Sequence, residues 1–256
     1  MFTTLISAAQ LQNLQASGTP LLVLDCTFDL MNPPAGHAQY AEQHIAGAQH
    51  ADLDQHLATH DPALRVNGGR HPLPQRESFA AWLKIIGMNH NTQVVVYDRN
   101  GANYCGRLWW MLKWAGHEAV AVLDGGLQAW EAAGGAVESG IPAAPQAGDF
   151  TLSAEKAVLA STATVAANLG RPKQTLLDAR ATPRFRGEME PLDPVAGHIP
   201  GALNRPFGAN LGPDGRFKAP DELKAEFQAL LAGRDPASVV HHCGSGVSAL
   251  PNLLAM

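Results

Sequence analysis

The chain has 256 residues, which is enough for one large domain or two domains of ordinary size. Charged residues make up 16% of it, and the net charge of −5 leaves no basic surplus to neutralise nucleic-acid phosphates. No apolar run reaches the length of a membrane span, and three cysteines are too few for a disulfide framework. We therefore expect a cytoplasmic protein with neither a nucleic-acid nor a membrane partner.

Short apolar runs alternate with amphipathic helical patterns along the first half. Residues 21–25 predict a buried strand that ends in an acidic residue, and residues 94–98 predict another. Between them, Phe79, Leu83 and Ile86 recur at helical spacing. Strands that alternate with helices are typical of an α/β fold, in which a mainly parallel sheet is flanked by helices.

The second half repeats four landmarks of the first half in the same order. The matching pairs are residues 21–25 with 175–178, 44–48 with 198–202, 69–70 with 215–216, and 94–98 with 239–243. The offset drifts from about 153 to about 145 residues, as loop insertions produce. This pattern predicts two domains of the same fold in tandem.

The composition also suggests where the two domains begin and end. We expect a first domain over residues 1–135, a linker rich in proline, alanine and glycine over 136–150, and a second domain over 151–256. Only thirteen residues follow Cys243, too few for the strand and helix predicted after Asp98 in the first half. By the logic of the repeat, we expect the second domain to be C-terminally truncated.

The segment after the last predicted strand carries the clearest chemical signal. Cys243 follows the apolar run, and Gly244 and Gly246 allow the next residues to curl so that backbone N–H groups point inward. The start of a helix adds a partial positive charge, and such surroundings favour the thiolate, which is the nucleophile. We expect Cys243 to be catalytic, within a loop that cradles the charged group bound to it. The residues of that loop are Gly244, Ser245, Gly246, Val247 and Ser248.

Two chemistries use a cysteine in such a loop. Cysteine-dependent phosphatases follow the pattern His-Cys-x-x-Gly-x-x-Arg, and Ala249 stands where the arginine should contact the phosphoryl oxygens. Sulfur transfer does not need that arginine. The alternatives that stay open are a phosphatase or arsenate-reductase-like enzyme, and a non-catalytic sulfur-binding protein with a truncated C-terminus.

In the first half Asp98 takes the position of the nucleophile, which predicts an inactive domain.

Three boxes resemble those of the tandem-domain rhodanese family of sulfurtransferases. They are His198–Ala202 with its weaker copy at His44–Ala48, the Asp-Gly-Gly box at Asp124–Trp130, and the active loop at Cys243–Ser248. The loop reads Cys-Gly-Ser-Gly-Val-Ser and is similar to that of the 3-mercaptopyruvate sulfurtransferase branch. The resemblance implies two rhodanese-like domains, an inactive first domain and a catalytic second one.

The resemblance also implies a reaction and its residues. A sulfane sulfur would pass from 3-mercaptopyruvate or thiosulfate to Cys243 as a persulfide, and then to a thiol, cyanide or thioredoxin-like acceptor, with no cofactor and no metal. Arg184 matches an arginine that binds the anionic donor. Leu192 stands where a second one is usual, and Arg186 is its candidate substitute. His44 matches a proposed proton relay, with a structural role as the alternative.

Overall fold

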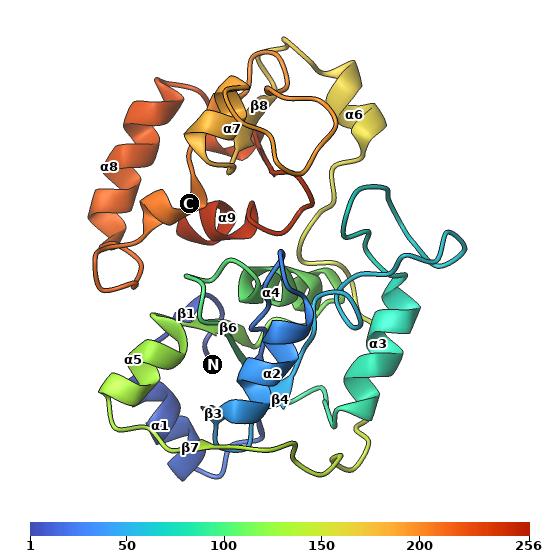
Figure 1. The fold of residues 1–256 in the computed structure, drawn as a ribbon, viewed down its shortest axis with the longest axis vertical. Coiled ribbons are helices and arrows are strands. Elements are labelled where there is room, and N and C mark those ends of the chain that lie inside the picture. The colour runs from blue at the N-terminus through green and yellow to red at the C-terminus, as the bar shows by residue number, and fades with distance from the viewer. The chain divides into compact units, whose positions relative to one another are not determined.

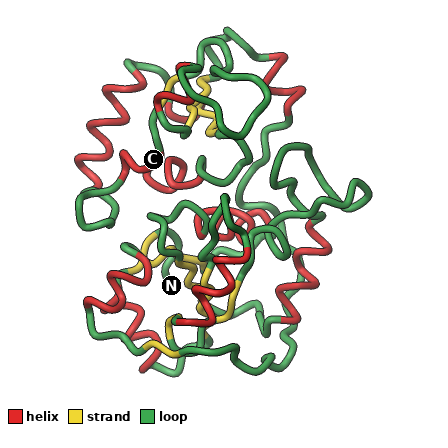
Figure 2. Tube along the Cα trace, viewed as in Figure 1, coloured by secondary structure: helices red, strands yellow, loops and turns green.

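The computed structural model describes residues 1–256, which divide into two compact units, Met1–Val158 and Leu159–Met256. Strands and helices alternate along both units (Figures 1 and 2). The strands of each main sheet run parallel, so the predicted α/β class with mainly parallel sheets is confirmed. None of the helices has the length and apolar character that a membrane crossing requires.

The first unit is built on a five-stranded sheet in the order β1-β6-β5-β2-β4. Its strands are β1 Leu5–Ile6, β2 Leu21–Asp25, β4 Gln49–His50, β5 Gln93–Tyr97 and β6 Val120–Leu123. All five residues of the central β5 are buried, which on a parallel strand requires cover on both faces. A separate antiparallel pair joins β3 His44–Ile45 to β7 Val137–Glu138.

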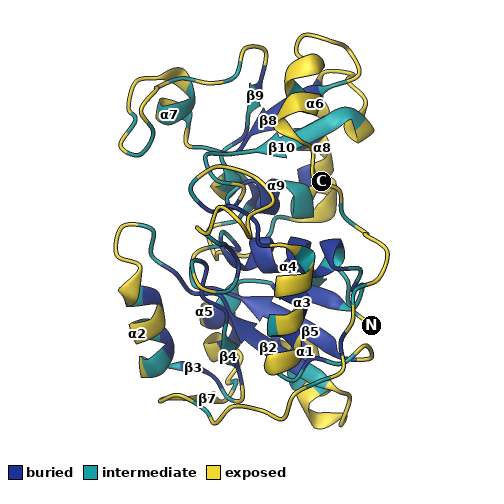
Figure 3. Cartoon of the chain, turned by 90° about the vertical axis from the view of Figure 1, so that its right-hand side faces the viewer, coloured by how far each residue is buried: buried dark blue, intermediate teal, exposed yellow.

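Five helices belong to the first unit. They are α1 Ala8–Ala16, α2 Pro34–Glu42, α3 Arg76–Ile85, α4 Cys105–Trp114 and α5 Gly126–Ala132. The predicted amphipathic pattern is confirmed in α3, which buries Phe79 and Leu83, and Ile86 is buried at its end. Nine of the ten residues of α4 are buried, and Figure 3 shows this helix among the buried elements. The helix after Asp98 is therefore part of the core.

Residues 136–150, whose composition predicts a linker, are attached to the first unit. The Gly148 N–H donates to the Lys84 carbonyl at 2.8 Å, and the Gly140 N–H donates to the Ala41 carbonyl at 2.7 Å. Phe150 is 1% exposed. Because these contacts hold the segment in place, the first compact unit extends to Val158, later than the predicted boundary.

The second unit has a smaller sheet, in the order β10-β8-β9. Its elements are α6 Thr162–Ala167, β8 Thr175–Asp178, α7 Thr182–Arg186, β9 Leu203–Asn204, α8 Pro220–Leu231, β10 Val239–His242 and α9 Leu250–Ala255, with short 3-10 turns at Phe207–Asn210 and Pro236–Ser238. Every residue of β8 is buried, whereas the edge strand β10 is half-buried. No residue of α6 is buried, and Figure 3 shows that helix exposed.

The strand registers show that the same strand pairing recurs in both sheets. In the first unit the last residue of β5 pairs with the last residue of β2, and in the second unit the last residue of β10 pairs with the last residue of β8. Asp98 and Cys243 therefore follow their strands at the same register. In both units the next helix begins seven residues later, at Cys105 and at Leu250.

Candidate active site

Cys243 differs from the other two cysteines in its surroundings. It directly follows β10, at the carboxyl end of a parallel sheet where ligands usually bind, and it is partly exposed. Cys26 and Cys105 are both buried, and burial raises the pKa of each thiol well above its usual range, with the negative charge of Asp98 adding to the rise. Cys243 is thus the cysteine best placed to meet a dissolved substrate.

The loop after Cys243 leads from β10 into α9. Gly246 has φ +71°, in the left-handed region that favours glycine. The side chains of Val247 and Ala249 are buried and anchor the loop. Pro251 lies in the first turn of α9, where its missing N–H leaves no helical hydrogen bond unmade.

A buried amide network holds α9 in place. The Asn252 Nδ2 donates to the Arg205 carbonyl at 2.8 Å, and the Asn210 Nδ2 donates to the Asn252 Oδ1 at 2.6 Å. The Arg205 Nε donates in turn to the Asn210 Oδ1 at 2.8 Å, and both asparagines are 0% exposed. The sequence analysis did not find this network. Its only signal was one asparagine inside the apolar run of the last helix.

Arg184, the predicted donor-binding arginine, lies on α7 and is held by two carboxylates that follow this helix. Its Nε and Nη2 donate to the Glu190 Oε1 at 3.1 and 2.6 Å, and its Nη2 also donates to the Asp193 Oδ2 at 2.9 Å. Hydrogen bonds from Arg184 lower the pKa of Glu190 to about 2. The Nε–Nη2 side of the guanidinium already binds a carboxylate, so an anionic donor must use Nη1 or displace Glu190.

Arg180, which the sequence analysis did not single out, ties this cluster to the sheet. Its Nη2 donates to the Asp178 Oδ2 at 2.8 Å and to the Gly197 carbonyl at 2.6 Å. Its Nη1 donates to the Glu190 Oε2 at 3.4 Å. The signal in the sequence was an arginine two residues after the acid that ends β8. Asp178 ends β8, and Glu190 is the carboxylate that pairs with Arg184. Arg180 therefore links the sheet of the second unit to the Arg184 cluster.

The structure separates Arg186 from that cluster. Its side chain is 64% exposed, and its ion pair joins Nη1 to the Glu188 Oε1 at 3.8 Å. Arg184 and Arg186 both lie on α7, but they pair with different carboxylates. The two guanidinium groups therefore do not form one clamp in this arrangement.

His44 lies fully buried in the first unit. Its Nδ1 is 2.8 Å from the Tyr40 carbonyl, and its Nε2 is 3.3 Å from the Glu138 Oε1. Its counterpart His198 has the same kind of contact, with Nδ1 2.7 Å from the Phe185 carbonyl. A histidine bonded to an upstream carbonyl is thus a shared feature of both units, which favours the structural role for His44.

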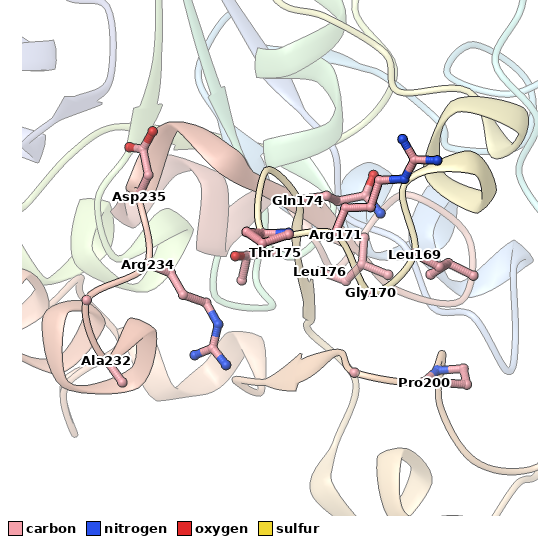
Figure 4. A pocket seen from close by; sticks show the side chains of 13 residues that line it. Leu169, Gly170, Arg171, Gln174, Thr175, Leu176, Pro200, Ala232, Arg234 and Asp235 are labelled. Atoms are coloured by element: carbon pink, nitrogen blue, oxygen red, sulfur yellow. The ribbon is translucent and has the colours of Figure 1, made fainter.

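A cavity of about 520 Å³ lies elsewhere in the second unit, at the amino ends of β8 and β10. Figure 4 shows Arg171 and Arg234 on its lining, with guanidinium groups that point to different sides. The Arg234 Nη1 donates to the Leu231 carbonyl at 3.1 Å. Because β8 and β10 run parallel from this cavity towards Cys243, the cavity and the cysteine lie at opposite ends of the sheet.

Comparison with known proteins agrees with the repeat. The family model described as "Rhodanese-like domain" matches twice, over residues 7–133 and 161–255. A Pseudomonas aeruginosa protein named probable 3-mercaptopyruvate sulfurtransferase is 48% identical over 98% of this chain and 89% of its own length. The human 3-mercaptopyruvate sulfurtransferase is 35% identical over 91% of this chain and 77% of its own.

A solved structure shows the same architecture over almost the whole chain. The Escherichia coli structure titled as a 3-mercaptopyruvate sulfotransferase with the rhodanese fold superposes with a TM-score of 0.82 and 30% identity, covering 99% of this chain and 93% of the other. The expected tandem organisation is therefore confirmed, and sulfur transfer is favoured over the phosphatase alternative. The chain belongs to the rhodanese-like domain family and is a tandem-domain sulfurtransferase, in the branch whose members are named 3-mercaptopyruvate sulfurtransferase.

Proposed function

We propose that Cys243 is the nucleophile of this sulfurtransferase and carries the transferred sulfur as a persulfide. The observation that supports this most is its position, since it is the partly exposed cysteine and follows a parallel strand at the start of a glycine-containing loop. We also propose that the sulfur donor is 3-mercaptopyruvate or thiosulfate, as the names of the relatives suggest.

Each half-reaction breaks one bond to sulfur and forms another. With thiosulfate, the Cys243 thiolate attacks the outer sulfur, the S–S bond breaks, and sulfite leaves with the electron pair. With 3-mercaptopyruvate, the S–C bond breaks, and the carbon takes the electron pair and a proton to give pyruvate. A thiol, cyanide or thioredoxin-like acceptor then removes the terminal sulfur and restores the thiolate.

The loop after Cys243 is the proposed cradle for the persulfide. A terminal sulfur carries negative charge, which inward N–H groups and hydroxyls stabilise. The left-handed Gly246 supports the required curl, and the buried Val247 keeps the loop in place. Ser245 and Ser248 supply the hydroxyl groups.

We propose that Arg184 binds the carboxylate or sulfonate end of the donor. Glu190 and Asp193 hold its guanidinium in one position, so little side-chain freedom remains to be lost when a donor binds. Arg186 is exposed, and it stays a secondary candidate. The first domain is proposed to be inactive because it has Asp98 in place of the cysteine. The three free cysteines suit the reducing cytoplasm.

Mass spectrometry of the full chain tests the proposal. After treatment with either donor and removal of the excess, we expect a gain of one sulfur atom on Cys243. The Cys243→Ser variant should show no gain, and Cys26→Ser, which changes a buried thiol, should keep it. An unmodified Cys243 with both donors, or an equal gain in the Cys243→Ser variant, would show the proposal to be wrong.

A further inference from the structure

The loop after β5 in the first unit surrounds a carboxylate with backbone donors. The Asp98 Oδ1 accepts the N–H of Asn100 at 2.8 Å and that of Ala102 at 3.1 Å. The Asp98 Oδ2 accepts the N–H of Tyr104 at 2.8 Å and that of Cys105 at 2.9 Å. Asp98 is only 1% exposed. Four donors converging on one buried anionic group is the arrangement of an anion-binding loop.

This loop is the counterpart of the loop that carries Cys243. Asp98 and Cys243 follow their strands at the same register. Three residues later each loop has a glycine in the left-handed region, Gly101 at φ +69° and Gly246 at φ +71°. Asp98 therefore takes the same position after its strand as Cys243 takes in the second unit.

We infer that the loop of the first unit is a complete binding site for a small, carboxylate-sized anion, and that Asp98 is its built-in ligand. Because the anion is part of the chain, it is always present, and the site stays closed to free anions. The first domain then does not compete with the second for an anionic donor. Only this last consequence rests on the proposed function, since the cradle is defined by its own hydrogen bonds.

The hydrogen bonds suit the ionised form of Asp98. Burial raises the pKa of this carboxyl, and the four backbone N–H groups oppose the rise. Each oxygen accepts two N–H groups, which a carboxylate satisfies fully. A protonated carboxyl would have to turn its hydroxyl hydrogen towards these donors.

The backbone around Asp98 indicates that the carboxylate holds the loop in shape. Ala102 has φ +62°, a left-handed conformation that is strained for a residue other than glycine. Its N–H is one of the four donors, so the carboxylate helps to offset that strain. Gly126, in the Asp-Gly-Gly box, allows the start of α5 to close over Asp98, because a Cβ there would lie 2.2 Å from the Asp98 carbonyl oxygen.

Chemical rescue of Asp98→Ala in the full chain tests the inference. This substitution removes the carboxylate and leaves its four donors unpaired, so we expect a lower Tm than in the parent chain. Sodium formate supplies the missing group as a free anion. Formate should reverse more than half of the decrease in Tm, with a saturable concentration dependence. Sodium chloride at equal ionic strength should not. The parent chain should show no such formate effect, because its site is filled.

Two matched variants distinguish anion binding from general stabilisation. Val96→Ala creates a cavity on β5, the strand that precedes Asp98, without removing an anion. Formate should therefore not rescue it. Asp98→Asn keeps the shape but turns an NH₂ group towards two of the donors, and we expect lower stability without formate rescue. If Asp98→Ala does not fold, its refolding yield with formate against formamide, the neutral analogue, gives the same test.

Three outcomes would overturn the inference. They are an Asp98→Ala chain as stable as the parent, equal responses of that variant to formate and chloride, and rescue of Val96→Ala by formate. All these measurements are independent of Cys243, and repeating them in a Cys243→Ser background should give the same result. A failure of the proposed sulfur chemistry would therefore leave this inference standing, and the reverse also holds.

Discussion

Asp98 and Cys243 place two different side chains at the same position after a strand. In the first unit the loop's N–H groups bind a carboxylate that belongs to the chain, whereas in the second the proposed charge arrives with each transferred sulfur. The buried Asp98 forms hydrogen bonds within the protein, whereas Cys243 keeps access to solvent. The residue at this position thus distinguishes the loop closed by Asp98 from the loop proposed to be reactive.

The residues next to Cys243 predict which donor is preferred. Gly244 and Ser245 put no positive charge beside the sulfur, so the dianionic thiosulfate gains no ion pair from the loop. The monoanionic 3-mercaptopyruvate needs one clamp for its carboxylate, for which Arg184 is the candidate. We therefore expect a higher kcat/KM for 3-mercaptopyruvate than for thiosulfate in steady-state kinetics.

Adding charge to the loop should narrow or reverse that preference. A cation 4 Å from an anion is worth about 4 kcal/mol at an effective dielectric of 20 before desolvation, and a small part of that changes a rate ratio tenfold. The double substitution Gly244→Arg with Ser245→Lys is the test. A thiosulfate preference in the unmodified chain would contradict the charge argument.

Arg184 is expected to act on donor binding. Arg184→Lys keeps the charge but loses the planar fork that Glu190 and Asp193 hold, so we expect KM for either donor to rise about tenfold, equivalent to about 1.4 kcal/mol. Alkylation of Cys243 by neutral iodoacetamide should hardly change. Arg216→Lys is the matched control in the same unit and should leave KM within about twofold, because its side chain is 50% exposed and has no proposed role in binding. Equal effects of the two substitutions would argue against a binding role for Arg184.

Individual elements followed from the sequence where the local pattern was strong. Residues 21–25 and 175–178 form β2 and β8, because an unbroken apolar run has to be covered on both faces. Residues 136–150 looked like a linker because composition does not reveal hydrogen bonds to distant carbonyls such as that of Lys84. Arg180 and Asn252 escaped notice for the same reason, since their partners become neighbours only in the fold.

The last helix depends on its amide network. Asn252→Ala leaves the Asn210 amide and the Arg205 carbonyl without their partner, which costs about 1–3 kcal/mol for a buried group. We expect urea unfolding to show a decrease of this size in the free energy of unfolding. We also expect slower persulfide formation on Cys243. Asn168→Ala is the matched control, because it changes a partly exposed asparagine of the same unit and should cost at most about 0.5 kcal/mol. A similar loss in both variants would show that the network does not specifically support α9.

The chain contains the same architecture twice, and the two units differ in the size of their sheets and cores. The first sheet has five strands and encloses β5, whereas the second has three and leaves β10 at its edge. The order of landmarks was enough to predict the tandem repeat, since each landmark marks a strand end or a turn that both units need. The positions of Asp98 and Cys243 followed from the same alignment. The four donors around Asp98 did not, because their convergence depends on backbone angles such as that of Ala102.

One histidine in each unit predicts how stability responds to acid. Burial lowers the pKa of His71 to about 4, with the positive charge of Arg107 adding to the effect, although Asp54 lies 3.5 Å from its Nε2. Burial likewise lowers the pKa of His241 to about 4, with His242 adding to the effect. An unfolded histidine takes up its proton near pH 6.5, so the unfolded chain binds protons first as the pH falls.

The free energy of unfolding should therefore be highest above pH 6.5 and fall as the pH drops from about 6.5 to about 4. Each of the two histidines contributes at most about 1.4 kcal/mol per pH unit to that slope. Urea unfolding at a series of pH values measures it, and His71→Gln and His241→Gln should each flatten it. His60→Gln is the control, because this side chain is 63% exposed and should leave the slope unchanged. Two results would show that protonation of these histidines does not cause the loss of stability in acid. One is a free energy of unfolding that stays constant between pH 6.5 and 4, and the other is a slope that neither substitution reduces.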